Sequence, residues 1–336
     1  MTMITSPTTS KDATARSTFV GDLVKDAFRP ERVQATAVKL VTLGLLIWGW
    51  ASIDNFLSAT NINAIMYSMA AVGIAAVGMA FITLSGNLFM LSMGATAAIS
   101  TVLFASILHI GLAATVPVVM LVGAGIGLVQ GVVVGIAGAN PIIATIAISS
   151  IVMGFGAWYS GGLTIVGEGD ASWLAVGKFL SFLPNQVVLF FLIAFAADFI
   201  VQRSRFGREL RLIGLNRDAA MVAGLRIARS LVIAFVIAGM LAALSGALFA
   251  SQAAQGNLKL GAGIDFDAIA AVLVGGVSIR GGHGRILDAA FGAAFLAVVG
   301  NILLVEGLPI EVQLAVKGMV VILAVVFGAL VGGKKR

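Results

Sequence analysis

The chain has 336 residues, of which 60% are hydrophobic and only 11% are charged, with 41 Gly and no Cys. Soluble globular domains carry about 25% charged residues. So few charges could not cover the surface of a soluble protein of this length, so most of that surface faces lipid. The lack of Cys excludes disulfides and thiol catalysis. Long unbroken apolar runs exclude a β-barrel, and the composition predicts an all-α integral membrane protein.

The first 34 residues carry five basic side chains and lack the apolar core of a cleavable signal peptide. Apolar residues recur at helical spacing from Phe19 to Phe28, before Pro30, which fits a short amphipathic helix on the membrane surface. An unstructured tail fits the same composition. Both interpretations stay open, and in either case we expect residues 1–34 to be a cytoplasmic segment that precedes a transmembrane domain at 35–336.

About ten apolar segments follow, each bounded by Gly, Pro, Asn or a charge. Their lengths are typical of membrane-spanning helices. We number them as predicted spans one to ten, in chain order: residues 36–53, 61–84, 88–108, 112–137, 141–159, 186–202, 229–252, 265–280, 286–304 and 310–332.

The positions of Lys and Arg test this count, because ten spans place both termini on one side of the membrane. Of the 21 basic residues, 18 fall on that side: six before residue 40, seven between spans six and seven, Arg280, Arg285, and three at the C-terminus. The positive-inside rule makes this side cytoplasmic. If spans two to five and seven to ten are structural repeats, their orientations are opposite, as in many transporters.

Span four carries Gly123, Gly127, Gly131 and Gly135, four residues apart. Such a stripe of small residues lets a second helix approach closely. We therefore expect helix packing here rather than the lining of a pore.

The sequence offers little catalytic chemistry. Gly177-Lys178 lacks the Ser or Thr of a phosphate-binding loop, so we expect the chain not to hydrolyse ATP itself. The two His residues and the Ser residues form no metal-ligand or triad pattern. We predict a non-enzymatic chain with no cofactor or metal of its own. The net charge of +6 follows the membrane topology, so it does not indicate a nucleic-acid partner.

The cytoplasmic segment 203–228, between spans six and seven, is basic. Asn216 is suited to cap a helix over residues 217–223 that ends near Gly224. Small side chains on this helix let another protein approach, and the flanking Arg side chains can pair with carboxylates or lipid phosphates. We predict a docking site at Asn216, Arg217, Asp218, Ala219, Ala220 and Gly224. The alternative is a solvated positive-inside loop.

Irregular polar backbone interrupts the apolar pattern at residues 85–87, 138–141 and 275–284. Membranes tolerate such backbone only where protein or a wet cavity satisfies it, which suggests a path for a polar solute. Lys317 lies about seven residues inside span ten, or roughly 10 Å deep. A buried charge needs a partner, and we expect an acidic one such as Asp267.

Several segments together resemble one known family, the permease subunits of bacterial ABC importers of the ribose, xylose, arabinose and galactose type. The similarity covers roughly residues 60–332. It is carried by residues 266–285 with their double Gly and Gly-Gly-His-Gly turn, Asn301, Val316-Lys317-Gly318, Arg205-Phe206-Gly207-Arg208, residues 214–220 and residues 141–145.

The resemblance implies an ABC-importer permease fold in the bacterial inner membrane. It also implies separate ATPase subunits that bind ATP and Mg, a second permease chain that is identical or related, a soluble binding protein, contact with membrane lipid, and a sugar-like solute. The segment 203–228 would then be the ATPase-coupling region. Together with the irregular segments, these expectations place the substrate path at Asn87, Phe89, Ser92, Asn140, Thr145, Asp267 and Asn301.

One segment departs from the family pattern. Members usually carry Gly-Gly-Ile-Asp-Leu-Ser-Val-Gly, whereas this chain has Leu88, Phe89 and Met90 in the corresponding run. The solute therefore stays open among sugars, deoxysugars, polyols and other small molecules. Two other classes of function also stay open: an ion- or proton-coupled secondary transporter that acts without an ATPase, and a structural membrane scaffold or enzyme subunit.

Overall fold

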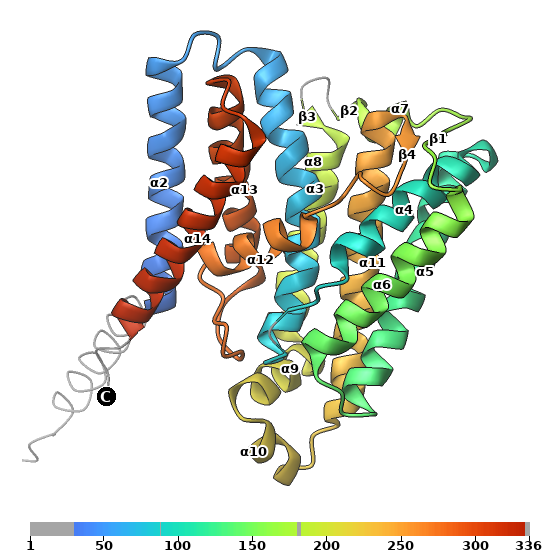
Figure 1. Ribbon diagram of the computed structural model, residues 1–336. Helices are drawn as coiled ribbons and strands as arrows, with labels where there is room; N and C mark the ends of the chain where they lie inside the picture. Colours follow the sequence, from blue (N-terminus) through green and yellow to red (C-terminus); the bar gives the residue numbers. More distant parts are fainter. Residues whose placement is uncertain (1–29, 88, 180–182, 333–336) are drawn as a thin grey trace, which may run out of the picture.

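The structure, a computed structural model, describes residues 30–87, 89–179 and 183–332. The predicted surface helix before Pro30, Leu88 and the basic residues 334–336 lie outside the described residues. The described chain forms a bundle of long helices that run between two ends (Figure 1).

Each predicted span corresponds to one helix. In chain order these are α2 (Pro30–Ser52), α3 (Ala59–Leu84), α4 (Met93–Ile107), α5 (Leu112–Gly135), α6 (Pro141–Ser160), α8 (Asn185–Arg203), α11 (Ile227–Ala253), α12 (Ile264–Val274), α13 (Ile286–Val305) and α14 (Ile310–Gly332). Within the described ranges, eight helices are long and apolar enough to cross a membrane. Two of the ten helices are not among these eight: α14, which has 23 residues, and α12, which has only 11.

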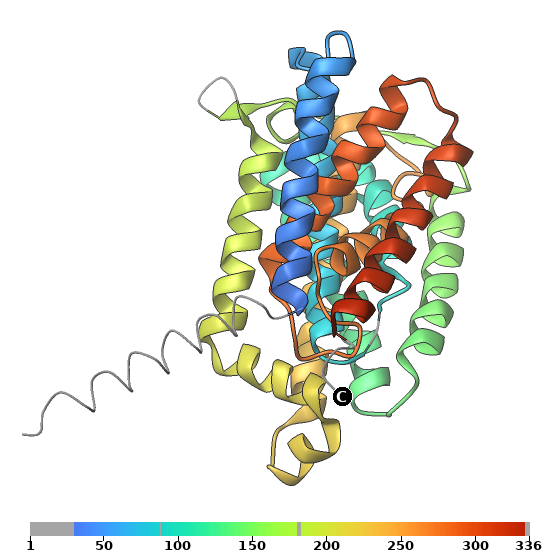
Figure 2. The ribbon, with the colours of Figure 1, turned by 90° about the vertical axis from the view of Figure 1, so that its left-hand side faces the viewer.

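Short elements occupy the two ends of the bundle. One end carries η1 (Leu108–Ile110), β1 (Ile165–Val166), α7 (Ser172–Ala175), β2 (Lys178–Phe179), β3 (Leu183–Pro184) and β4 (Gln255–Gly256). Strand β1 pairs antiparallel with β4, and β2 pairs with β3. At the opposite, Arg-rich end, α9 (Arg205–Leu215) and α10 (Arg217–Val222) project beyond the bundle (Figures 1 and 2).

The predicted bounds of spans three and eight were too long, because α4 begins at Met93 instead of residue 88 and α12 ends at Val274 instead of residue 280. The irregular backbone predicted at residues 85–87 and 275–284 is present. Gly86 and Gly276 adopt φ values of 79° and 90°, which a right-handed helix cannot contain. The segments that precede α4 and follow α12 are therefore irregular backbone. Gln34 of α2 donates from Nε2 to the Leu273 carbonyl oxygen at 2.8 Å and so satisfies the end of α12.

The helix contacts fall into matching pairs. Helix α11 packs against α5 and α4, as α3 packs against α13 and α12. Likewise α4 contacts α6, as α12 contacts α14. Helices α3 and α11 run in opposite directions through the centre (Figure 1). This is the pattern expected for an inverted repeat of α3–α6 with α11–α14.

The glycine stripe of span four is a packing surface, which confirms that prediction. A Cβ added to Gly127 would lie 2.2 Å from the Phe235 carbonyl oxygen of α11, and one on Gly123 would lie 2.4 Å from the Gly239 carbonyl oxygen. No side chain fits there, so the backbones of α5 and α11 touch directly.

Candidate functional site

The first turns of the two short helices meet inside the bundle. A Cβ added to Gly94 of α4 would lie 3.1 Å from Oδ1 of Asp265 on α12. Each helix start carries partial positive charge on its free N–H groups. The two starts and one carboxylate thus form a polar centre between otherwise apolar helices. Sequence reasoning missed Asp265, although it stands two residues before the predicted Asp267.

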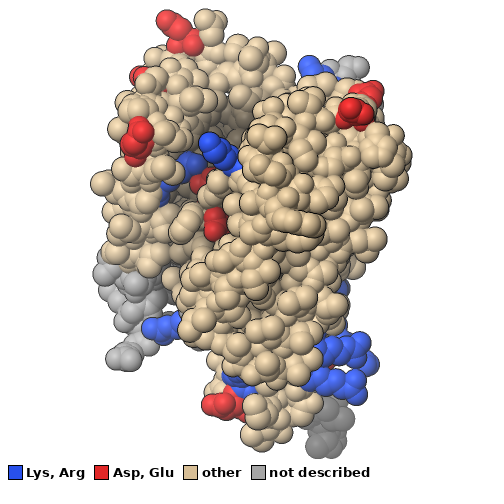
Figure 3. All heavy atoms as spheres, turned by 45° about the vertical axis from the view of Figure 1, so that its right-hand side comes forward, with Lys and Arg blue, Asp and Glu red and all other residues tan. Residues whose placement is uncertain are grey.

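Lys317 and Asp267 form an ion pair beside this centre, which confirms the prediction that Lys317 pairs with an acidic residue. The Lys317 Nζ lies 3.0 Å from Asp267 Oδ1 and 3.2 Å from Oδ2. The side chains are 25% and 27% exposed. Figure 3 shows basic and acidic side chains together in a hollow of the surface. The pair joins α14 to α12 and leaves no net charge at this depth.

A second polar group lies at the start of α4. The Ser92 hydroxyl donates to Gln130 Oε1 of α5 at 2.9 Å, and the Leu91 N–H donates to Thr145 Oγ1 of α6 at 3.2 Å. Ser92, Gln130 and Thr145 are fully buried. The Gln130 Nε2 has no hydrogen-bond partner within the described part of the chain. Gln130 was missed, although a lone Gln in an apolar span was a signal.

The structure does not bring the other predicted path residues to this centre. Phe89 packs half-buried against the core. Asn87 is buried and donates to Ser85 Oγ at 3.0 Å. Asn140 is exposed and caps α6 by accepting from the Ile142 N–H at 3.0 Å. Asn301 of α13 exchanges two side-chain hydrogen bonds with Asn61 of α3, at 2.7 and 3.1 Å.

The predicted cytoplasmic helix is present and capped as expected. The Asn216 Oδ1 accepts from the Ala219 N–H at 2.9 Å, and Gly224 follows α10 with a φ of 74°. Ala219 is exposed, but Ala220 is 4% exposed and packs inward, so it cannot be the contact surface that was predicted.

Instead, Val222 of α10 is 91% exposed and Met221 beside it is also exposed. Sequence reasoning missed both residues. Their signal was an apolar pair at the end of a helix that is otherwise polar or small. Arg217 and Asp218 are exposed on the same helix.

Glycines let three chain segments cross at the inner end of the bundle. A Cβ on Gly214 of α9 would lie 2.1 Å from the Leu84 carbonyl oxygen and 2.5 Å from the Gly282 nitrogen. One on Gly281 would lie 2.6 Å from the Gly86 Cα. We call Gly86, Gly214, Gly281 and Gly282 the glycine crossing. Through it, α9 touches the irregular segments beside both α4 and α12.

Arg211 of α9 reinforces this contact. Its Nη2 donates to the Gly284 carbonyl oxygen at 3.3 Å, and the Gly282 N–H donates to the Leu84 carbonyl oxygen at 2.9 Å. Helix α9 thus contacts both irregular segments, at Gly214 through its backbone and at Arg211 through a side chain.

An all-α membrane bundle with two interrupted helices and a protruding, capped helix at its basic end has the architecture of a transport permease. Residues 61–325 match the family described as branched-chain amino acid transport system / permease component, and the chain belongs to this family. It is a membrane permease subunit of an ABC importer and a multi-pass protein of the bacterial inner membrane.

Curated relatives cover most of the chain. The ribose import permease protein RbsC of Escherichia coli K12 is 32% identical over 84% of this chain and 85% of its own length. The galactose/methyl galactoside import permease protein MglC of Haemophilus influenzae is 33% identical over 89% and 94%. The L-arabinose ABC transporter permease protein AraH of Azospirillum brasilense is 27% identical over 88% and 87%. No solved structure matches the chain.

Proposed function

We propose that this chain forms, with a second permease chain, the path by which a sugar or sugar-like solute enters the cell. The names of its relatives, which specify ribose, galactose and arabinose, support a sugar over a branched-chain amino acid. A soluble binding protein would deliver the solute to the outer end, where residues 161–179 and β4 lie. Separate ATPase subunits would bind ATP and Mg.

The path would run between the starts of α4 and α12. Asp265 can accept hydrogen bonds from solute hydroxyls, and no ion pair occupies it among the described residues. The buried Ser92 and Gln130 offer further polar groups on the α4 side. The neighbouring Lys317–Asp267 pair adds no net charge to this path.

The ATPase would bind α10, and the glycine crossing would carry its movement to the path. The observation that carries this proposal is the fit of Gly214 between the Leu84 carbonyl oxygen and Gly282. Even a Cβ has no room at Gly214, so the three segments are closely packed and a shift of α9 would displace both irregular segments. We infer that these segments close the inner end in one state and open it in the other.

The alternative, an ion-coupled transporter without an ATPase, is not favoured. Such a transporter needs a titratable carboxylate in the membrane. Asp267 is engaged by Lys317, whereas Asp265 has no ion-pair partner among the described residues. What disfavours this alternative is the family match, together with the similarity to ABC import permeases.

The docking proposal is tested by Val222→Arg, because a charge at this exposed position alters only the surface of α10. The control is Val176→Arg, at an exposed outer position. We expect Val222→Arg to abolish co-purification of the ATPase subunits from membranes, and Val176→Arg to retain it. Retention of the ATPase by Val222→Arg would overturn the proposal. Thermal shifts of the binding protein across a panel of sugars and branched-chain amino acids would then identify the solute class.

A further inference from the structure

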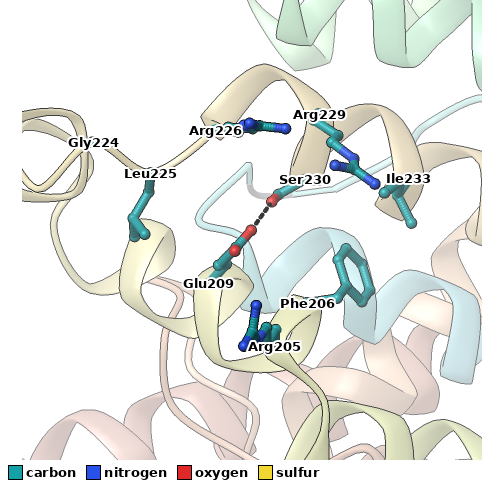
Figure 4. Close-up of a pocket in the computed structure, with 9 residues that line it drawn as sticks. All are labelled: Arg205, Phe206, Glu209, Gly224, Leu225, Arg226, Arg229, Ser230 and Ile233. Atoms are coloured by element: carbon teal, nitrogen blue, oxygen red, sulfur yellow. Dashed lines mark hydrogen bonds between the residues drawn. The ribbon is translucent and has the colours of Figure 1, made fainter.

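A pocket of about 440 Å³ lies between the start of α9, the link from α10 to α11 and the first turns of α11 (Figure 4). Three of the residues that line it are Arg205, Arg226 and Arg229. All three are exposed and none forms an ion pair with a residue of the described chain. The pocket therefore offers three unpaired guanidinium groups.

One acidic residue, Glu209, also lines the pocket. It accepts a hydrogen bond from the buried Ser230 hydroxyl at 3.0 Å, which holds it against α11 (Figure 4). Three arginines and one carboxylate leave the lining with a formal charge of about +2 at neutral pH. The charge complements an anion, and guanidinium groups suit phosphate oxygens in particular.

The position of the pocket indicates which kind of anion it binds, a lipid head group or a free anion. Helix α8 ends at Arg203 and α11 begins at Ile227, so the pocket lies where two membrane-spanning helices reach the inner surface. Phe206 and Ile233 form an apolar part of its wall, and Phe206 stacks on Phe81 of α3 at 6.2 Å. A free anion gains nothing from such a wall, whereas the glycerol and upper acyl chain of a lipid do.

We propose that this pocket binds the phosphate head group of an anionic phospholipid of the inner leaflet. The site is distinct from the exposed face of α10, which projects farther from the bundle (Figure 2). A bound lipid would connect α9 to the first turns of α11 within the segment 203–228. Basic pockets at this membrane level are suited to lipid head groups.

The test uses the full chain, purified in detergent and incubated with phosphatidylglycerol or phosphatidylcholine, with bound lipid read by native mass spectrometry. The wild-type protein should retain phosphatidylglycerol in preference to phosphatidylcholine. The double variant Arg226→Gln/Arg229→Gln should weaken retention by about twenty-five-fold, at about fivefold for each arginine. The matched control Arg217→Gln/Arg280→Gln removes two exposed cytoplasmic arginines outside the pocket and should leave retention unchanged.

Glu209→Gln gives a second test with the opposite sign. The Gln oxygen can still accept from Ser230, but the negative charge is lost, so retention of phosphatidylglycerol should rise. This outcome does not depend on the stability of the arginine variants.

Three results would overturn the proposal. Equal loss in both double variants would show diffuse attraction to basic residues. Displacement of the lipid by millimolar inorganic phosphate would show a site for a free anion. If Arg226→Gln/Arg229→Gln lost co-purification of the ATPase subunits while its retention of phosphatidylglycerol stayed unchanged, the pocket would be a protein-binding site.

Discussion

Gly94 of α4 faces Asp265 of α12 so closely that an added Cβ would lie 3.1 Å from the carboxylate oxygen. The contact joins the two halves of the permease at the first turns of their two short helices. Two short helices that meet by their first turns can separate without breaking a continuous hydrogen-bonded helix.

Gly94→Val should therefore lower transport strongly while the protein still inserts in the membrane. The larger side chain overpacks the contact at a cost of about 1–3 kcal/mol. Gly154→Val is the matched control, because Gly154 on α6 has open space where its Cβ would lie. Uptake of labelled solute, normalised to the amount of protein in the membrane, measures the effect. Equal uptake by the two variants would contradict a role for this contact.

Gly214→Ala should uncouple ATP hydrolysis from transport. The new Cβ would lie 2.1 Å from the Leu84 carbonyl oxygen, so α9 must shift. We expect a loss of about 1–3 kcal/mol in stability together with a fall in the solute imported per ATP hydrolysed. Gly125→Ala, at a helix position with open space, should be neutral or slightly stabilising. The reconstituted complex with its ATPase subunits provides both rates, and unchanged coupling in Gly214→Ala would refute the proposed transmission route.

Lys317→Met should destabilise the protein by about 1–3 kcal/mol, because it leaves the partly buried Asp267 carboxylate without its partner. Further replacement of Asp267 by Asn should recover part of that loss, since no charge is then left unpaired. Thermal unfolding in detergent compares the wild-type protein, Lys317→Met and the double variant. A double variant no more stable than Lys317→Met would contradict the loss of the ion pair as the cause.

A double variant at the Ser92–Gln130 contact distinguishes a role of these side chains in transport from a role in stability. The Gln130 Nε2 is buried without a hydrogen-bond partner within the described ranges, so the hydrogen-bonding capacity of the Gln130 side chain is only partly satisfied. Ser92→Ala/Gln130→Met should keep or raise stability by up to about 1 kcal/mol, because both polar partners are removed together. If these groups bind solute, uptake should fall at the same time. A variant that unfolds earlier and transports normally would assign them a structural role alone.

In the outer loop, Asp170 gives a pH-dependent contact. Hydrogen bonds from the Ser172 side chain and N–H hold the pKa of the Asp170 carboxyl below its ordinary value; its Oδ1 lies 2.7 Å from the Ser172 nitrogen. A lowered pKa means that the contact stabilises the loop above the ordinary value and loses this effect as the pH falls through the lowered one. The protection factor of the Ser172 amide, which is its exchange rate relative to the intrinsic rate at each pH, should therefore fall on acidification. Asp170→Asn should abolish this pH step, and its persistence in the variant would assign the step to another group.

Much of the architecture could be predicted because its signals are local. Apolar runs located the helices, and the glycine stripe indicated the α5–α11 contact that the structure contains. The cap at Asn216 depends only on residues within one helical turn. The Lys317–Asp267 pair was predictable because a charge deep in a membrane requires a partner and few acids were in reach.

Other features depend on segments that are distant in sequence. Composition placed spans three and eight but could not show where their helices stop, because glycine tolerates both helical and irregular backbone. The inward packing of Ala220, the exposure of Val222 and the polar contact of Gln130 likewise depend on which neighbours the fold supplies.

The sequence by itself determined that this is a membrane-spanning permease with a capped helix at its basic end, because hydrophobic length, charge placement and capping act over short stretches of chain. Only the tertiary structure decided that the starts of α4 and α12 meet at Asp265, and that α9 touches both interrupted segments at Gly214. Those contacts join residues far apart in the chain, and their closeness is set by how the helices pack together.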